Sequence, residues 1–250
     1  MIKVSNLNQY FETGVPALDN INFSIKKGEF VAIIGPSGSG KSTLLRCINR
    51  LVTPTSGHIY FYGQDICKMR QFVLRQLRRS IGIVFQQFNL ISRQSVLKNV
   101  LYGSLGSMGT IRSLFHLFGQ QDIALAHHNL SLLGLSGKEY VRIDQLSGGE
   151  QQRVAIARSL MQSPVLILAD EPVASLDPVS SETVMMHLKK LNQDRNITII
   201  ATVHSIDIVK KYFTRVLGLQ AGRLIFDGSV ADLDASVVQT IYENDAYELF

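Results

Sequence analysis

The sequence has 250 residues, of which 46% are hydrophobic and 18% are charged, a composition typical of a globular chain with a sizeable core. Its 25 Lys and Arg residues exceed its 20 Asp and Glu residues by too little to indicate nucleic-acid binding. The longest apolar runs, such as Ile197–Val203, fall far short of the ~20 residues of a membrane helix. Because Met1–Phe11 lacks an apolar core and the two cysteines make no disulfide framework, we expect a cytosolic chain without a secretory signal.

Strand-like and helix-like segments alternate in the first part of the chain. Short apolar runs bounded by turn residues predict strands, and apolar residues that recur at helical spacing predict a helix. The predicted elements are the strands Ile21–Ile25 and Phe30–Ile34, the helix Ser42–Leu51, the edge strand Gly57–Tyr62 and the buried strand Ile81–Phe85.

The stretch from about Gln86 to Gln145 has no long β-branched run, and helical spacing predominates at Ser95–Leu101 and Ile123–Leu133. The predicted elements after it are the helix Glu150–Met161, the strand Val165–Ala169, the helix Val179–Gln193, the strand Ile197–Val203 and a strand pair around Val216–Phe226. This alternation predicts an α/β fold with a mostly parallel sheet, and the strand-poor middle predicts a helical insertion.

The segment Gly35–Ser42 reads GPSGSGKS and fits the pattern G-x-x-x-x-G-K-[ST] between a buried strand and a helix. Its glycines let backbone amides close around phosphate oxygens, and the following helix N-terminus adds positive potential. In this pattern Lys41 reaches the β- and γ-phosphates and the Ser42 hydroxyl ligates Mg²⁺. We therefore expect the chain to bind a nucleoside triphosphate.

A second chemical motif is VLILADE, in which a buried strand delivers Asp170 and Glu171 to its carboxyl end. Open parallel sheets bind their ligands at this edge. Asp170 can hold Mg²⁺ through water, and Glu171 can orient or deprotonate an attacking water, a role that a kinase does not need.

The segment Leu146–Arg153 reads LSGGEQQR and predicts a helix that Ser147 caps. Two glycines leave backbone amides open at the helix start, which makes a second anion cradle. The alternative interpretation is an ordinary Ser-capped helix. Because one phosphate loop satisfies one nucleotide, we expect the second cradle to serve the nucleotide of another chain.

LSGGEQQR strongly resembles the signature of ATP-binding cassette (ABC) transporters, and other landmarks of that family follow in the family's order over residues 2 to about 230. The resemblance implies that Gln86 senses the γ-phosphate and contacts a transmembrane subunit. It also implies that His204 touches the γ-phosphate, that Phe11 lies against adenine, and that Asp177 lies at a dimer interface.

The family resemblance implies a single domain with the P-loop NTPase (RecA-like) fold, with an antiparallel β subdomain beside the mostly parallel sheet. It places the core at about residues 1–85 and 146–230, the helical subdomain at about 86–145 and a C-terminal tail at 231–250. We expect the end of the chain to form a terminal helix packed on the domain. Two such cassettes would form a head-to-tail homodimer.

The implied site is composite. The expected ATP-binding residues are Phe11, Gly35, Pro36, Ser37, Gly38, Ser39, Gly40, Lys41, Ser42 and Thr43 of one chain, with Ser147, Gly148, Gly149 and Asp177 of the other. The expected catalytic residues are Lys41, Gln86, Glu171 and His204, and the expected Mg²⁺ ligands are Ser42, Gln86 and Asp170.

Within the ABC family, the stretches STLLRCINRLVTPTSG and FQQFNLISRQSVLKNVLYGSLG resemble the ATP-binding subunits of phosphonate importers, although Ile111 stands where members often have Trp. This resemblance implies that ATP hydrolysis drives phosphonate uptake. The implied partners are two transmembrane permease subunits and, through them, an extracytoplasmic solute-binding protein. The implied location is the cytoplasmic face of the cell membrane, with peripheral attachment.

Other functions stay open at this point. The same ATPase role in a phosphite, hypophosphite or other small-solute importer fits the motifs, as does a soluble P-loop ATPase that is not coupled to transport. A kinase or GTPase would need an acceptor site or an N-K-x-D motif and would leave LSGGEQQR unexplained. A DNA- or ribosome-associated ABC ATPase would need a basic stripe or a long coiled-coil insertion, and the sequence has neither.

Overall fold

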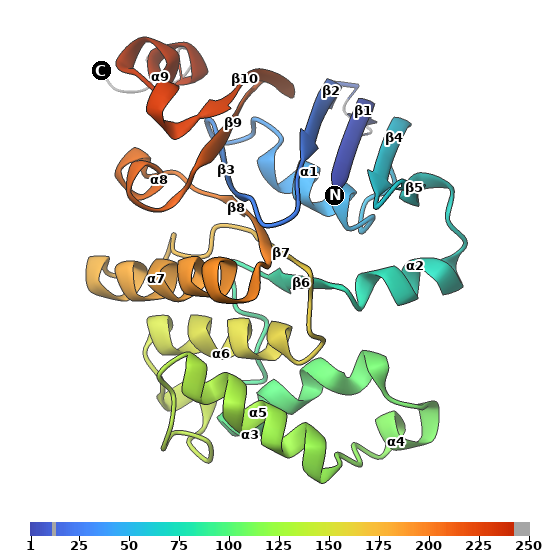
Figure 1. Ribbon diagram of the computed structural model, residues 1–250, viewed down its shortest axis with the longest axis vertical. Coiled ribbons are helices and arrows are strands. Elements are labelled where there is room, and N and C mark those ends of the chain that lie inside the picture. The colour runs from blue at the N-terminus through green and yellow to red at the C-terminus, as the bar shows by residue number, and fades with distance from the viewer. Residues whose placement is uncertain (12–13, 243–250) are drawn as a thin grey trace. The chain divides into compact units, whose positions relative to one another are not determined.

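A computed structural model describes residues 1–11 and 14–242. Its internal contacts divide the chain into two units. The terminal unit comprises Met1–Arg75 and Thr198–Phe250, and the middle unit comprises Gln76–Ile197 (Figure 1). The boundary falls within helix α2 (Gln71–Arg78). The subdomain limits implied by the family resemblance stay a prediction.

The terminal unit contains an antiparallel sheet in the order β2-β1-β4-β5. Its strands are β1 (Ile2–Tyr10), β2 (Pro16–Ile25), β4 (Ser56–Phe61) and β5 (Gln64–Asp65). Figure 1 shows β1, β2 and β4 side by side. This sheet confirms the predicted antiparallel β subdomain. Strand β1 was not predicted.

The terminal unit also holds parallel strands, in which β3 (Phe30–Ile34) pairs with β8 (Thr198–Thr202) on one side and β9 (Arg215–Gln220) on the other. All residues of β3 and β8 are buried, as expected of strands covered on both faces. The remaining elements are β10 (Arg223–Ser229), antiparallel to β9, the helices α1 (Lys41–Ile48), α8 (Ile206–Tyr212) and α9 (Ala235–Tyr242), and the 3₁₀ turns η1 (Ile66–Lys68) and η4 (Val230–Asp232).

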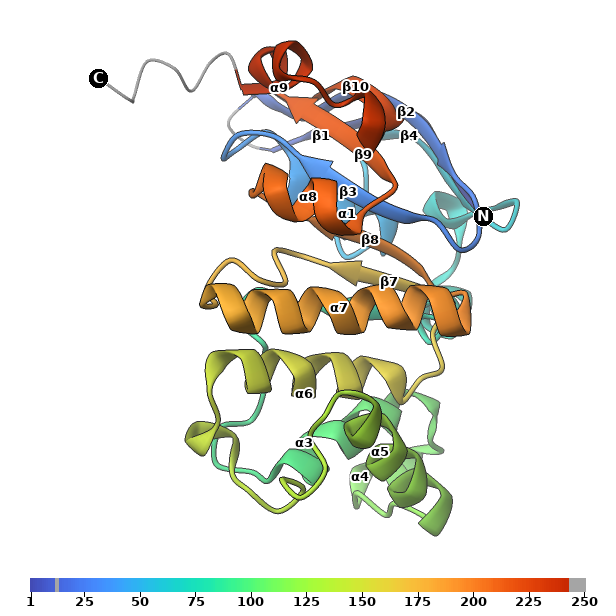
Figure 2. The ribbon, with the colours of Figure 1, turned by 60° about the vertical axis from the view of Figure 1, so that its left-hand side comes forward.

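The middle unit is built around α6 (Gly148–Leu160), which packs against α3, α5 and α7 (Figure 2). Helix α6 also packs against β6. Two parallel strands, β6 (Ile81–Val84) and β7 (Leu166–Ala169), run in register from Ile81 opposite Leu166 to Val84 opposite Ala169. The other elements are α3 (Val96–Leu101), η2 (Tyr102–Ser107), α4 (Thr110–Leu114), α5 (Gln120–Leu132), η3 (Ile143–Gln145) and α7 (Pro178–Arg195).

These elements confirm the predicted α/β class and the strand-poor, helical stretch after β6. Helix α1 ends earlier than predicted because Arg50 adopts a left-handed conformation with φ of 50°. The Arg50 guanidinium donates to the carbonyl oxygens of Ile66 and Met69, which fixes that turn. The predicted terminal helix is α9, and residues 243–250 of the predicted tail lie outside the described residues. In the part of the chain that the structure describes, no helix has the length and apolar character to cross a bilayer.

Candidate nucleotide site

The predicted phosphate loop connects β3 to α1. Inside it, Lys41 Nζ donates to the carbonyl oxygens of Gly35 and Pro36 at 2.8 and 2.7 Å, and the Lys41 side chain is buried. The loop is closed by a bond from Ser39 N to Pro36 O at 3.2 Å and tied to the β9–β10 turn by one from Gly222 N to Ser39 O at 3.1 Å. A buried ammonium is therefore held within a backbone loop.

The loop leads into α1 through Gly40, and among the described residues no side chain caps the helix and no acid occupies its first turn. The first backbone N–H groups of a helix have no partner within the helix, and together with the helix dipole they attract anions. This helix start has the chemistry of a phosphate site.

Strand β2 begins beside the phosphate loop. Gly40 has φ of 101°, and a Cβ atom built on it would lie 2.4 Å from Ala17 O, so the loop and the strand approach closely. Tyr10 at the end of β1 pairs with Pro16, and Phe11 follows it with 48% of its surface exposed. The predicted adenine contact, Phe11, thus directly follows the end of β1 that pairs with the start of β2.

His204 lies at the same sheet edge as the loop. Strands β3 and β8 are parallel, with Ile33 opposite Thr202. The carboxyl ends of both strands therefore lie at the same edge of the sheet. Val203 N donates to Ile33 O at 3.1 Å, and the exposed His204 follows directly. The terminal unit therefore brings the phosphate loop and His204 to one edge of its sheet.

The middle unit has its own cluster at the carboxyl ends of β6 and β7. Asp170 N donates to Val84 O at 2.9 Å, so Asp170 leaves β7 beside the end of β6, from which Gln86 follows two residues later. Gln86 is exposed, and Asp170 and Glu171 are half-buried. The parallel register brings these three predicted residues to one edge.

Glu171 adopts a left-handed backbone conformation with φ of 49°. A non-glycine residue in this region carries backbone strain, which persists only where the surroundings impose it and which is common at functional sites. The turn that follows is fixed by a bond from Ala174 N to Glu171 O at 3.3 Å. The strain marks Glu171 as a residue whose direction the fold specifies.

Helix α6 begins with a capping box. Ser147 Oγ accepts from Glu150 N at 3.3 Å, and Glu150 Oε2 accepts from Ser147 N at 3.0 Å. Glu150 Oε1 also receives an ion pair from Lys138 Nζ. The hydrogen bond from Lys138 is the main cause that lowers the pKa of Glu150 below its ordinary value, and the bonds with Ser147 lower it further. These bonds favour the ionised form of the carboxylate that completes the capping box.

The two glycines at the start of α6 lie against α7 and the loop before it. A Cβ on Gly149 would lie 2.6 Å from Ser180 Cβ, and one on Gly148 would lie 3.1 Å from Leu176 Cδ2. Asp177 Oδ1 caps α7 by accepting from Ser180 N at 2.9 Å. Hydrogen bonding with the Ser180 side chain, and secondly this backbone bond, lower the pKa of Asp177. The middle unit thus brings Ser147, Gly148 and Gly149 next to the loop that carries Asp177.

The side chains predicted to hold Mg²⁺ have suitable chemistry, because a hydroxyl at Ser42, an amide at Gln86 and a carboxylate at Asp170 all offer hard oxygen ligands. Mg²⁺ is usually bound by one or two carboxylates together with substrate phosphates. Across residues 1–11 and 14–242, no group of three or more His, Cys, Asp or Glu side chains could hold an ion by itself.

Two functional candidates escaped the sequence analysis. Lys138 supports the capping box, and Arg158 of α6 donates to the carbonyl oxygens of Phe88 and Asn89, just after Gln86. Each of these contacts joins residues that are not neighbours in the sequence, so no motif or regular spacing could predict it.

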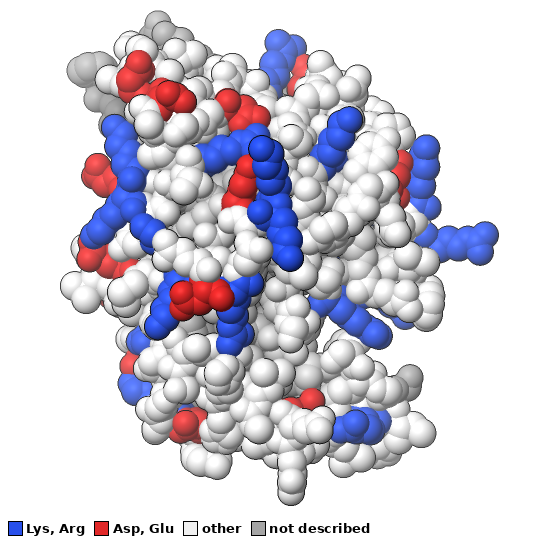
Figure 3. All heavy atoms as spheres, in the orientation of Figure 1, with Lys and Arg blue, Asp and Glu red and all other residues white. Residues whose placement is uncertain are grey.

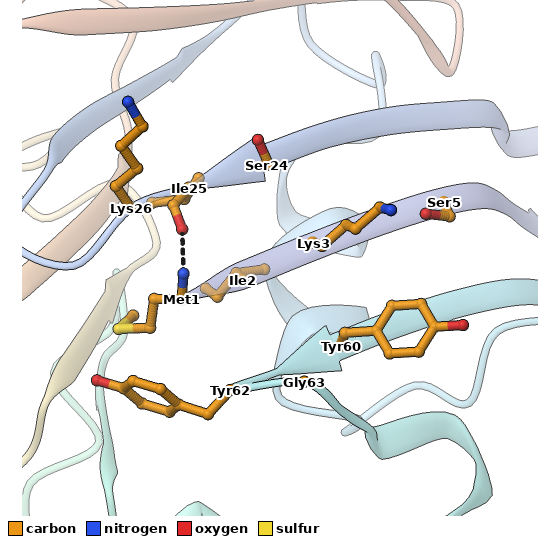
Figure 4. A pocket seen from close by; sticks show the side chains of 10 residues that line it. All are labelled: Met1, Ile2, Lys3, Ser5, Ser24, Ile25, Lys26, Tyr60, Tyr62 and Gly63. Atoms are coloured by element: carbon orange, nitrogen blue, oxygen red, sulfur yellow. Dashed lines mark hydrogen bonds between the residues drawn. The ribbon is translucent and has the colours of Figure 1, made fainter.

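A separate hollow of about 640 Å³ opens on the terminal unit, lined in part by Lys3, Lys26, Tyr60 and Tyr62. Figure 4 shows the Met1 amino group at its edge, donating to Ile25 O at 2.8 Å. No predicted site residue lines this hollow. On the face drawn in Figure 3, acidic side chains lie among the basic ones.

The family is established by comparison with known proteins. The family model described as "ABC transporter" matches residues 18–174, which is more than half of the chain. The chain belongs to the ABC transporter family.

Its predicted resemblance to phosphonate-import ATP-binding proteins is also confirmed by its relatives. The "Phosphonates import ATP-binding protein PhnC" of Bdellovibrio bacteriovorus is 48% identical over 250 residues, covering 100% of this chain and 96% of that protein. The protein of the same name from Bacillus anthracis is 48% identical over 242 residues, covering 97% and 94%.

Solved ABC cassettes share the fold. A dimeric ATP-binding cassette in a post-hydrolysis state, bound to ADP and phosphate, has a TM-score of 0.81 and 37% identity, with 92% of this chain and 99% of that chain covered. A cassette from Clostridium perfringens that is part of the ABC transporter complex cbiONQ has a TM-score of 0.83 and 32% identity, with 99% and 98% covered. The predicted ABC cassette fold is confirmed.

Proposed function

We propose that this chain is the ATP-hydrolysing subunit of an ABC importer for phosphonates. ATP binding closes a homodimer of two cassettes, hydrolysis opens it, and the motion is passed to two transmembrane permease subunits. A solute-binding protein outside the membrane delivers the cargo to those subunits. The cassette lies on the cytoplasmic face of the membrane as a peripheral subunit.

The ATP phosphates bind in the loop Gly35–Thr43. Lys41 is already held inside this loop by the carbonyls of Gly35 and Pro36, so its ammonium is close to where the phosphates enter. The start of α1, which carries no acid in its first turn, presents the positive end of the helix dipole to the same phosphates. Phe11 stacks on adenine, and about half of its surface (48%) is exposed.

Hydrolysis is assigned to the β6–β7 edge and to His204. Glu171 orients the attacking water and accepts its proton, and its strained backbone supports a fixed role. Gln86 and His204 contact the γ-phosphate. A bound Mg²⁺, held by Ser42, Gln86 and Asp170, would neutralise charge that develops on the phosphates.

The signature segment acts on the nucleotide of the partner cassette. Ser147, which the capping box fixes at the exposed start of α6, binds a γ-phosphate together with the amides of Gly148 and Gly149. Asp177 lies at the dimer interface. ATP that binds the dimer but not the separated cassettes stabilises the dimer by mass action.

The observation that carries the proposal is that one chain holds two helix starts suited to phosphate, one at α1 and one at α6, where a single nucleotide needs one loop. A dimer in which each nucleotide is shared explains both. The choice of phosphonates as cargo rests on the relatives named phosphonates import ATP-binding proteins, which match this chain over nearly its whole length.

Growth on different phosphorus sources tests the proposal. A strain lacking the gene for this chain should fail to grow on methylphosphonate and grow normally on phosphate and on phosphite. Wild-type chain should restore growth on methylphosphonate, and Lys41→Ala should not. Loss of growth on phosphite alone would contradict phosphonate as the cargo and keep the importer role. Rescue by Lys41→Ala would contradict the ATPase role itself.

A further inference from the structure

The segment directly after Gln86 is strained and clamped. Phe88 and Asn89 are consecutive non-glycine residues in the left-handed region, with φ of 55° and 50°. Asn tolerates this region, but a bulky aromatic residue rarely occupies it. A conformation of this kind persists only where its surroundings impose it.

Arg158 supplies the constraint. From α6 its guanidinium donates through Nη2 to Phe88 O at 2.9 Å and through Nη1 to Asn89 O at 2.5 Å. Two parallel donors from one planar group fix the direction of two successive carbonyls, which is a task that a Lys ammonium performs poorly. Burial lowers the pKa of Arg158. Arginine side chains are effectively always protonated in proteins, so the group acts as a cation.

The far end of the segment is held as well. Ile91 N donates to Asn99 Oδ1 at 2.8 Å, and Asn99 Nδ2 donates back to Ile91 O at 3.2 Å, with Asn99 fully buried on α3. The segment between Gln86 and Ile91 is thus fixed by side chains of two helices, while Gln86 itself is exposed.

Phe88 also reaches the signature. Its Cζ atom lies 4.0 Å from the position of a Cβ on Gly148, at the start of the helix that carries Arg158. The same helix therefore meets the strained segment twice, through the Phe88 ring near its start and through Arg158 near its end. A displacement of α6 must move this segment, or else break both contacts.

We propose that Arg158 is a positioning residue for ATP hydrolysis, locking the segment after Gln86 to the signature helix so that the Gln86 side chain and the signature motif move as one body. This inference rests on the proposed function, because it assigns Arg158 an effect through the γ-phosphate contact of Gln86. Through this lock, a shift of α6 changes the position of Gln86, and a shift of Gln86 changes the position of α6. The Arg158 guanidinium contacts the carbonyls of Phe88 and Asn89, so it acts through the segment that follows Gln86.

A double-mutant cycle on the full chain tests this role. Steady-state ATP hydrolysis and ATP binding are measured for wild type, Arg158→Lys, Gln86→Ala and the double variant. Arg158→Lys keeps the positive charge but loses the paired guanidinium donors to the two carbonyls. We therefore expect kcat to fall about tenfold, equivalent to about 1.4 kcal/mol, while KM stays within about threefold of the wild-type value. In the Gln86→Ala background the same change should have almost no further effect on kcat.

Arg153→Lys is the matched control for the cycle. Arg153 lies on the same helix and also donates to backbone carbonyls, those of Leu133 and Gly149, but it does not contact the strained segment. Whatever its own effect, it should combine additively with Gln86→Ala. If Arg158→Lys fails to fold, Asn89→Gly replaces it, because glycine releases the strained backbone without removing any acceptor; a loss of kcat that vanishes in the Gln86→Ala background is again expected.

Additive losses for Arg158→Lys and Gln86→Ala would overturn the inference, as would an unchanged kcat in Arg158→Lys. A fall in melting temperature with kcat and KM unchanged would show a purely structural clamp and would also overturn it. A wild-type chain that neither binds nor hydrolyses ATP would instead contradict the proposed function, so the two failures are distinct.

Discussion

The start of α6 is packed so tightly against α7 that one added methyl group should disturb it. In Gly149→Ala the new Cβ would lie 2.6 Å from Ser180 Cβ and 2.7 Å from Ser180 Oγ. Carbon atoms attract best at about 3.5–4.0 Å, so the two helix starts must separate by roughly 1 Å. Overpacking of this kind costs about 1–3 kcal/mol.

Urea unfolding measures this cost, since the slope for a chain of this size is about 1–3 kcal/mol per molar. We expect the midpoint of Gly149→Ala to fall by about 1 M. The displaced helix start should also weaken ATP-dependent dimerisation, which gel filtration of the variant in a Glu171→Gln background can detect. An unfolding midpoint equal to that of wild type would refute the packing argument.

Three variants separate this clash from a general intolerance of alanine. Gly148→Ala approaches the Leu176 Cδ2 atom closely, at 3.1 Å, and that flexible end can rotate away, while the Phe88 ring lies at an ordinary contact distance of 4.0 Å, so its midpoint should stay close to that of wild type. Ser180→Gly removes both clashing atoms, and adding Gly149→Ala to it should cost little more. Ser180→Ala retains the clashing Cβ and should give no such rescue.

Two further predictions concern α6 and the β7 edge. Lys138→Met should destabilise the chain by about 0.5 kcal/mol at pH 7. Because the pKa of Glu150 is lowered in the folded state, this contribution is present above the unfolded value of about 4.3 and is lost as the pH falls through the folded value. Urea curves at pH 7 and at a series of lower pH values check it, and a destabilisation that stays constant as the pH falls below about 4.3 would count against the ion pair. Glu171→Gln should bind ATP, barely hydrolyse it and accumulate as a dimer; normal turnover would exclude Glu171 as the base.

The chemistry-bearing motifs were predictable because their residue types and spacing follow from phosphate binding. The loop Gly35–Ser42 lies between the predicted strand and helix, and Ser147 caps α6 with the predicted acid in the first turn. Strands β3 and β7 were equally predictable, because each is a short run of apolar residues and all of these residues are buried.

Strand β1 was missed because its alternation is interrupted. Its register with β2 shifts after Val4, and Asn6 adopts φ of 50°, so apolar residues do not recur at strict period two. Side-chain bonds stabilise the irregularity, including one from Asn20 N to Asn8 Oδ1 at 2.8 Å. The nine residues of β1 contain no local pattern that indicates these hydrogen bonds to β2, which follows later in the sequence.

Contacts across the sequence were likewise beyond prediction. The strain at Phe88 depends on Arg158, about seventy residues later, and the capping box at Ser147 gains Lys138 from a loop that precedes it. Such partners become visible only when the fold brings them together. The sequence predicts which residues meet a nucleotide, and the structure adds the contacts that hold those residues in place.

Complementation between two inactive variants tests most directly whether the two helix starts act on one shared nucleotide. In a mixture of Lys41→Ala and Ser147→Arg chains, a head-to-tail heterodimer has one site with both defects and one intact site. The account predicts no ATP hydrolysis by either variant alone and hydrolysis of up to roughly a quarter of the wild-type rate in an equal mixture. Absence of hydrolysis in the mixture at every ratio, or full activity of Ser147→Arg alone, would contradict it.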